Sequence, residues 1–439
     1  MADLRRRKKP RPTVDASLCR AVLLNPELRL LVHAYQDGIY EDLAPLAAEA
    51  MGIRRRGCTW QADTTLQLIL PERYFAAYRT RTLSSDDLCL EPARLNALAL
   101  HLALFEGNLR VVQRWLRCHP THLTPRAVDC ATRYAHMELV EWLLAWTKGT
   151  SAAVDYAATI GHMGLLTRLL AAAPGSFRAM DAAATHGHLE VLWHLHTHTS
   201  LSPSVCAIDG AAANGHLDTI RFLDEHRTVG CSVAAMDAAA GNGHLDVVRY
   251  LHTYRDEGCS VRAMDSAAAH GHLEIVQWLH THRHEGCSRR AMNSAATNGH
   301  LETVQWLHQH RNEGCSTHAM DGAAANGHLE IVRFLHVHRR EGCSTAAMDD
   351  AAKNGFLNVV QWLHEHRVEG GTEAGVAETR DAGFDDIADF MRSHCRTDLR
   401  VECTSVADDD ESSASGDDDV LIMLYEEDDD PDNPRWPVF

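Results

Sequence analysis

The fold of this 439-residue chain is decided by a phrase that recurs in register. Residues 317–332 read THAMDGAAANGHLEIV, with Asn326-Gly327-His328-Leu329 near the centre. The regular copies place their turn glycines 28 residues apart, at Gly215, Gly243, Gly271, Gly299, Gly327 and Gly355, and Gly383 continues the series. Looser copies lie upstream around Gly107, Ala135, Gly161 and Gly187. A period sustained over so many units predicts a repeat architecture.

Each unit reads as two helices. Residues 319–325 predict a short, alanine-rich first helix, which Gly327 ends because glycine accepts the left-handed conformation beyond a helix end. A longer second helix then has an apolar face, formed by Leu329, Ile331, Val332, Phe334 and Leu335. One unit cannot bury its apolar side alone, so we predict an all-α helix-turn-helix solenoid of stacked units.

The unit resembles the ankyrin repeat in three places: Ala323-Ala324, Asn326-Gly327-His328-Leu329 and Ile331-Val332. The resemblance covers roughly residues 93–396. An ankyrin repeat runs to about 33 residues with a β-turn element between units. The shorter period here, with Ala319-Met320-Asp321 replacing the usual Thr-Pro-Leu-His opening, implies short or absent β-hairpin fingers. Such short, histidine-rich units look like the ankyrin proteins expanded in some protists and large viruses. The resemblance implies partner binding on a concave face built from first helices and loops.

Composition excludes several classes of protein. Hydrophobic residues make up 45% of the chain and charged residues 23%, as in a folded globular protein. No apolar run reaches the roughly 18 residues of a membrane span, and the charged start lacks the apolar core of a secretory signal. Thirteen cysteines are too few for a disulfide scaffold. We therefore expect reduced thiols in a cytoplasmic or nuclear protein, and a monomer.

The two ends carry opposite charges. Residues 1–12 hold six basic residues and one acidic residue, whereas residues 401–439 hold fourteen acidic residues and one basic residue. We expect disordered arms at 1–12 and 397–439, and a helical cap region at 13–92 that covers the first unit. Residues 5–11 fit a nuclear-localisation patch or a solvated terminus. The body has no strong positive field, which argues against nucleic-acid binding.

Three ladders recur once per unit and favour structural roles. The aromatic ladder is Phe222, Tyr250, Trp278, Trp306, Phe334, Trp362 and Phe390, which we interpret as packing between units. The cysteine ladder is Cys231, Cys259, Cys287, Cys315 and Cys343, with neighbours expected too far apart for disulfides. The aspartate ladder is Asp209, Asp237, Asp265, Asn293, Asp321 and Asp349. Catalysis by these carboxylates is disfavoured because Asn293 breaks the charge.

Histidines form two further ladders. One follows each turn glycine, as at His328, and we expect it to bond across the turn and begin the second helix. The other comes in pairs: His280/His282, His308/His310, His336/His338 and His364/His366. Residues two apart do not share a helix face, so the pairs do not predict a chelating site. Adventitious metal binding and pH sensing remain open for the stacked imidazoles.

One position varies inside an otherwise fixed unit, two residues before the methionine. It reads Arg178, Cys206, Ala234, Arg262, Arg290, His318 and Ala346. Variation of this kind is what a specificity surface needs. We predict partner contacts at Arg178, Arg262, Arg289, Arg290 and His318.

The acidic tail holds a second candidate contact. Val420, Leu421, Ile422, Met423 and Leu424 form an apolar run between acidic runs and resemble a SUMO-interacting motif. Such a peptide can add a strand to a partner's sheet, with its acids steered to a basic rim. SUMO or a SUMO-modified protein is thus a candidate partner. The alternatives are a solubility tail, or docking onto the chain's own histidines or arginines.

The sequence as a whole predicts a protein-interaction scaffold. The alternative is a substrate adaptor of a ubiquitin or SUMO ligase complex, which would need residues 13–92 to bind ligase subunits. No phosphate-binding glycine loop, nucleophile elbow, His-Glu-x-x-His or Cys-x-x-Cys motif occurs, so we expect neither an enzyme nor a cofactor or metal site.

Overall fold

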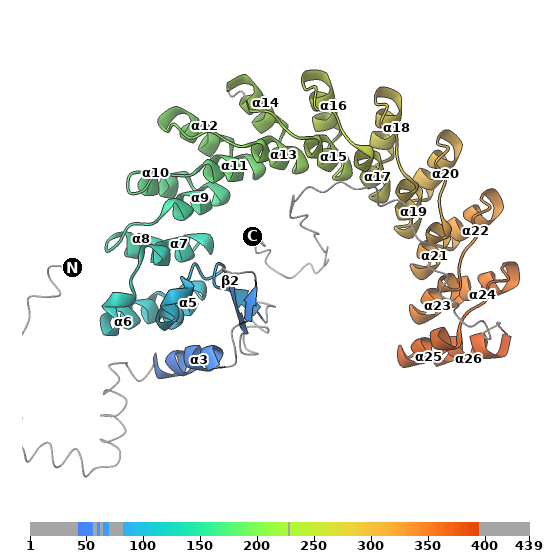
Figure 1. Ribbon diagram of the computed structural model, residues 1–439, viewed down its shortest axis with the longest axis horizontal. Helices are drawn as coiled ribbons and strands as arrows, with labels where there is room; N and C mark the ends of the chain where they lie inside the picture. The colour runs from blue at the N-terminus through green and yellow to red at the C-terminus, as the bar shows by residue number, and fades with distance from the viewer. Residues whose placement is uncertain (1–42, 56–58, 62–64, 70–81, 227–228, 395–439) are drawn as a thin grey trace, which may run out of the picture.

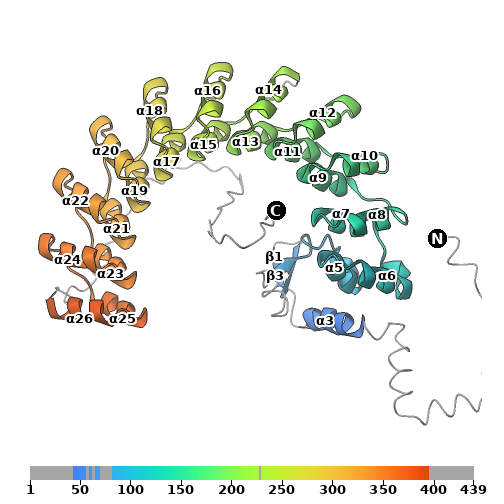
Figure 2. The ribbon, with the colours of Figure 1, turned by 180° about the vertical axis from the view of Figure 1, so that it is seen from behind.

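The computed structural model describes residues 43–55, 59–61, 65–69, 82–226 and 229–394. Figure 1 shows an arc of helix pairs that runs from α5 and α6 at one end to α25 and α26 at the other. The first helix of each pair lies on the inner, concave side, and the second lies on the outer side. Figure 2 shows the same two layers from behind. The predicted all-α solenoid is confirmed.

The inner helices are α5 (Leu98–Phe105), α7 (Pro125–Arg133), α9 (Ser151–Ile160), α11 (Phe177–Thr185), α13 (Val205–Ala213), α15 (Val233–Gly241), α17 (Val261–Ala269), α19 (Arg289–Thr297), α21 (Thr317–Ala325), α23 (Ala346–Lys353) and α25 (Glu373–Asp381). The outer helices are α6 (Leu109–Cys118), α8 (Met137–Leu144), α10 (Met163–Leu170), α12 (Leu189–His198), α14 (Leu217–His226), α16 (Leu245–Tyr254), α18 (Leu273–His282), α20 (Leu301–His310), α22 (Leu329–His338), α24 (Leu357–His366) and α26 (Asp385–His394). Short 3-10 helices, η2 (Pro92–Ala97) and η3 (Pro120–His122), flank the first pair.

The turn inside each pair has the geometry that the repeated glycine predicts. Gly271 has φ +74°, and its N–H donates to the Ala268 carbonyl while the His272 N–H donates to that of Ala267. These bonds satisfy two carbonyls at the end of the inner helix. All ten turn glycines from Gly107 to Gly383 share the positive φ, and Ala135 adopts φ 55° at the same place in the second pair.

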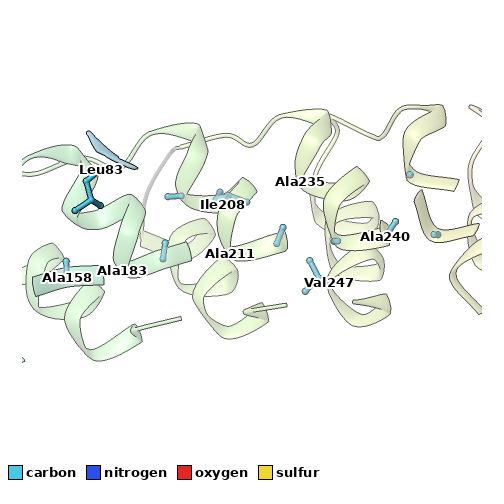
Figure 3. Packing of buried hydrophobic residues seen from close by; sticks show 14 of the residues in the cluster. Leu83, Ala158, Ala183, Ile208, Ala211, Ala235, Ala240 and Val247 are labelled. Carbon is cyan, nitrogen blue, oxygen red and sulfur yellow. The ribbon is translucent and has the colours of Figure 1, made fainter. Parts of the chain in front are cut away.

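Alanine packing explains the curvature of the arc. Inner helices of neighbouring pairs contact one another extensively, whereas outer helices contact their neighbours at few points. Figure 3 shows Ala183, Ala211 and Ala240 among the fully buried side chains between inner helices. Small side chains allow the inner helices to approach closely, while rings hold the outer helices apart. The stack therefore bends toward the inner layer.

The segment before the first pair differs from expectation. Helix α3 (Ala44–Arg55) lies in the region predicted as a helical cap, but three short strands follow it. Strands β1 (Thr59–Gln61), β2 (Thr65–Ile69) and β3 (Thr82–Ser84) form an antiparallel sheet of order β1-β2-β3, with Leu68 opposite Leu83. Strands this short give little periodicity, so the sequence did not predict the sheet. Residues 13–42 of the expected cap region lie outside the described residues.

The end of this segment is fastened to the inner layer of the solenoid. Arg133 of α7 donates from Nη2 to Asp87 Oδ1 at 2.8 Å, and the Tyr134 hydroxyl donates to the Asp87 carbonyl at 2.9 Å. His101 of α5 is buried, with Nδ1 2.6 Å from the Leu88 carbonyl oxygen, and burial lowers the pKa of this imidazole to about 4. Residues 82–91 therefore pack against the first two pairs.

The links between pairs are short. Residues 283–288 join α18 to α19, and every strand in the described residues precedes residue 85. The prediction of short or absent β-hairpin fingers thus agrees with the architecture. Among the described helices, none has the length and apolar character that crossing a membrane requires.

Candidate partner-binding face

The five basic residues predicted as partner contacts lie at the starts of inner helices. Arg178 is in the first turn of α11, Arg262 in that of α17, Arg289 and Arg290 in that of α19, and His318 in that of α21. All five side chains are exposed. Within the described residues, none of the four arginines is in an ion pair at 4.0 Å or less, whereas most other arginines of the solenoid are. Their charge is therefore available to a partner.

A bond network between units fixes the backbone that carries these side chains. The Ser260 N–H donates to Asp237 Oδ1 at 2.8 Å, and its hydroxyl donates to Asp237 Oδ2 at 2.5 Å. Ser260 Oγ in turn accepts from the Arg262 N–H at 3.1 Å, which caps α17. The same bonds join Asp265 to Ser288 and the Arg290 N–H. Each aspartate of the ladder thus accepts hydrogen bonds from the residue at the start of the following inner helix.

The sequence predicted a structural role for the aspartates but missed their partners. Each aspartate lies 23 residues before a serine or threonine that recurs with the same period, and that pairing was the available signal. Asn293 retains the network, since its Oδ1 accepts from the Ser316 N–H at 2.9 Å and its Nδ2 donates to Ser316 Oγ at 2.9 Å. Burial raises the pKa of Asp265, Asp321 and Asp349 above their ordinary values.

Two other variable positions on the inner helices serve packing. Gly210 follows Thr185 of the preceding unit, and a Cβ at Gly210 would lie 2.2 Å from Thr185 Oγ1. Gly322 and Thr297 repeat the arrangement, with a Cβ 2.1 Å from the hydroxyl oxygen. Gly241 reverses it, because the next unit carries Ser266 in the matching place. At these two positions a larger residue in one unit is matched by a smaller residue in its neighbour, so their variation reflects packing. The first-turn position is therefore the better candidate for binding specificity.

The turn histidines bond to the preceding unit rather than across their own turn. His188 Nε2 lies 2.9 Å from the Thr159 carbonyl oxygen, and His136 Nε2 lies 3.0 Å from that of Phe105. Each imidazole covers the previous turn glycine, so that a Cβ at Gly271 would lie 2.5 Å from His300 Nδ1. Among the turn histidines for which the structure describes a helix cap, only His162 caps its own helix, by accepting from the Leu165 N–H at 3.0 Å. The expectation of a bond across the turn is therefore wrong for most of the ladder.

The aromatic ladder and the paired histidines form a ring cluster at each junction between neighbouring outer helices, and these clusters together make the outer stack. His280 meets Trp306 of the next unit edge-on, with centroids 5.2 Å apart at 84°. Trp306 then stacks on His310 of its own helix, with centroids 4.4 Å apart at 11°. The same alternation occurs at His336, Trp362 and His366. Packing between units was predicted for the aromatic residues, but the histidines that complete it were not.

The cysteine ladder lies beside an arginine–glutamate pair in each link. Arg283 pairs with Glu285 near Cys259, and Arg311 pairs with Glu313 near Cys287. Burial first, and then the adjacent glutamate charge, raises the pKa of Cys259 and Cys287 to about 11. The cysteines in the described residues are free thiols. Thiols held protonated are poor nucleophiles and poor metal ligands, which fits the predicted small loop residue.

Two further predictions meet the limits of the described chain. Within it, no three histidine, cysteine or carboxylate side chains are grouped so that they could hold a metal ion. Val420, Leu421, Ile422, Met423 and Leu424, predicted as a tail contact, lie outside the described residues.

Two family models of repeat proteins agree with this architecture. A family model of ankyrin repeats (many copies) matches residues 264–308, and a model of ankyrin repeats (3 copies) matches residues 292–374. A search of curated proteins finds no match. Among solved structures, the pentatricopeptide repeat protein PPR10 from maize is similar, with 11% identity and a TM-score of 0.36. That match covers 73% of this chain and 56% of the maize protein.

Proposed function

We propose that this chain is a scaffold whose concave face selects a protein partner. Family models of ankyrin repeats, which generally mediate protein–protein binding, match it within residues 264–374. Ankyrin repeats are typically non-enzymatic, in keeping with a binding role. The observation that carries the proposal is a set of exposed basic residues on an otherwise repeated inner layer: Arg178, Arg262, Arg289, Arg290 and His318. These charges suit an acidic segment of the partner.

Charge reversal tests the concave face. The full-length chain with Arg262→Glu, Arg289→Glu and Arg290→Glu should lose its principal partners in affinity capture with mass spectrometry. Arg249→Glu with Arg340→Glu is the matched control, because both are exposed and lie on an outer helix or a link. Equal capture by the two variants would show that the inner arginines are not contacts.

The acidic tail supplies a second docking element in this proposal. Its support is the apolar run Val420–Leu424 between acidic runs, which suits strand addition to SUMO or a SUMO-modified protein. Replacing these five residues with alanine in the full-length chain should remove that binding, while the inner-face partners stay. Binding of SUMO by both chains would refute this role.

The ligase-adaptor alternative and the location in the cell remain predictions. An adaptor would need residues 13–92 to bind ligase subunits, and capture of those subunits by the full-length chain would favour it. The basic run at residues 5–11 suits nuclear import, and the reduced cysteines suit either the nucleus or the cytoplasm. Imaging of the tagged chain with and without that run would decide between the two.

A further inference from the structure

The outer layer breaks its repeat at the junction of α12 and α14. Trp193 of α12 stands where later units have arginine or glutamine: Arg221, Arg249, Gln277, Gln305, Arg333 and Gln361. Glu225 of α14 faces the same junction. Among the junctions of the 28-residue units, this is the one that combines a tryptophan with a glutamate at these two positions. Positions whose side chains hold neighbouring units together keep a similar residue type from unit to unit. A residue that departs from this pattern on an exposed surface therefore points to another role.

The departure forms an open hollow of about 510 Å³ with an aromatic floor. The side chain of Trp193 is 51% exposed, although its ring centroid lies 5.5 Å from that of Phe222 and 5.6 Å from that of His226. Phe222 is buried and stacks on His226, with centroids 4.6 Å apart at 23°. Trp193 therefore rests on a rigid support and leaves much of its ring surface to solvent.

The rim of the hollow is acidic. Glu190, Asp218 and Glu225 line it, together with Arg221. The Arg221 charge is already shared, because Nη1 lies 3.7 Å from Asp218 Oδ1 and the guanidinium carbon lies 5.8 Å from the Tyr250 ring centroid. Within the described residues, Glu190 and Glu225 make no ion pair. Two carboxylates therefore remain free to meet a positive charge beside the Trp193 ring.

We propose that this hollow binds a lysine or arginine side chain from a basic segment of a partner protein. The indole is the ring that attracts a cation most strongly, and the two free carboxylates would add charge and hydrogen-bond acceptors. Leu189 in the lining offers apolar contact to the stem of the bound side chain. The site lies on the outer layer, so its occupation is independent of partner binding on the concave face.

The test uses the full-length chain and a fluorescein-labelled octapeptide, Gly-Ser-Arg-Lys-Arg-Lys-Ser-Gly. A second peptide with glutamine in place of each cation is the control. By fluorescence anisotropy, the basic peptide should bind, and Trp193→Ala should weaken it about tenfold, within the range of a desolvated cation–π contact. Glu225→Gln should weaken it by about threefold. Trp193→Phe should retain part of the affinity, and Tyr254→Ala, which removes an exposed ring of α16, should leave it unchanged.

Each other outcome overturns the proposal. Binding that does not depend on Trp193 would place the peptide at another acidic site of the chain, such as the acidic tail. Equal binding of the glutamine peptide would show an apolar patch without charge selection. Failure of the basic peptide to bind both the unmodified chain and the chain with residues 5–9 changed to alanine would exclude the site. Binding that appears only after residues 5–9 are changed to alanine would identify the chain's own basic arm as the occupant, in place of a partner.

Discussion

The inner and outer helices of this solenoid meet their neighbours in different ways. Inner helices pack through fully buried alanines such as Ala267 and Ala295. Hydrogen bonds such as those that Ser288 donates to Asp265 join each unit to the next. Outer helices meet through half-exposed rings, as at His336 and Trp362, and through charged links. The inner contact is close and accepts only side chains of a suitable volume, whereas the outer contact is open and tolerates substitution.

This difference explains where variation can serve binding. Changes at the inner contact must be compensated in the next unit, as the pair Thr297 and Gly322 shows. The first-turn position of the inner helix escapes this constraint, because its side chain points to solvent while its backbone is held by the serine cap. On the outer layer, Trp193 replaces a polar residue without disturbing the stack. Both candidate contact surfaces thus consist of exposed side chains on a fixed backbone.

The largest expected effect comes from adding bulk to the inner contact. Ala295→Leu inserts three carbons where Ala295 has no exposed surface, and it should destabilise the chain by about 3 kcal/mol, at the upper end of the cost of overpacking. Thr281→Leu makes a similar change at an exposed position of outer helix α18 and should stay within about 0.5 kcal/mol. Urea unfolding followed by circular dichroism measures both. Equal losses would mean that the two layers do not differ in packing.

A smaller loss is expected when the inner bond network is cut. Asp265→Ala removes the acceptors of the Ser288 N–H and hydroxyl and should cost about 1–2 kcal/mol. Asp265→Asn should cost clearly less, because Asn293 keeps both bonds to Ser316 at the equivalent place. Hydrogen exchange at the start of α19 reports the local opening. If both variants open α19 equally, the carboxylate charge matters more than the bonds.

The sequence predicted the fold more completely than the contacts between units. The glycine period and the alanine-rich helix were sufficient for the solenoid, since both encode local geometry that repeats. The pairing of His300 with Gly271, or of Asp237 with Ser260, depends on which faces of successive units meet, and periodicity alone does not fix that. Residues 59–84 lie outside the repeat, so no neighbouring copy indicated the sheet. The hollow beside Trp193 was not predicted because side chains of the following unit form part of its lining.

The third prediction concerns how stability depends on pH, which differs between the histidines and the inner aspartates. Burial lowers the pKa of His188, His216, His272 and His300 at the turns, and of His252, His308 and His336 in the outer stack, below the ordinary 6.5. As the pH falls through 6.5, the unfolded chain takes up protons before the folded chain does. The stability that these histidines contribute is therefore complete above pH 6.5 and is lost as the pH falls toward their lower pKa in the folded chain. The melting temperature should therefore drop by several degrees between pH 7.5 and pH 5.5.

The inner aspartates give the matching control for that measurement. Burial raises the pKa of Asp265 and Asp321 from 3.8, so the folded chain takes up these protons first and gains stability as pH falls into that range. Their effect has the opposite sign and acts at more acidic pH. A melting temperature that is flat between pH 7.5 and pH 5.5 would show that the imidazoles contribute no net pH dependence.

The smallest effect is expected within the outer stack itself. His336 touches Trp362 of the following unit edge-on at 5.2 Å, whereas His366 stacks on the same ring from within α24 at 4.4 Å. His336→Ala removes a contact between units and should cost about 0.5–1.5 kcal/mol, the range of an aromatic pair. His366→Ala removes the stack within one exposed helix and a more distant ring contact with His336, at 6.1 Å, and should cost only about 0.2–0.5 kcal/mol. Urea unfolding at pH 7.5 compares the two variants. If His366→Ala proved the more costly, the rings would serve mainly to hold each outer helix, and coupling between units would lie almost entirely in the inner layer.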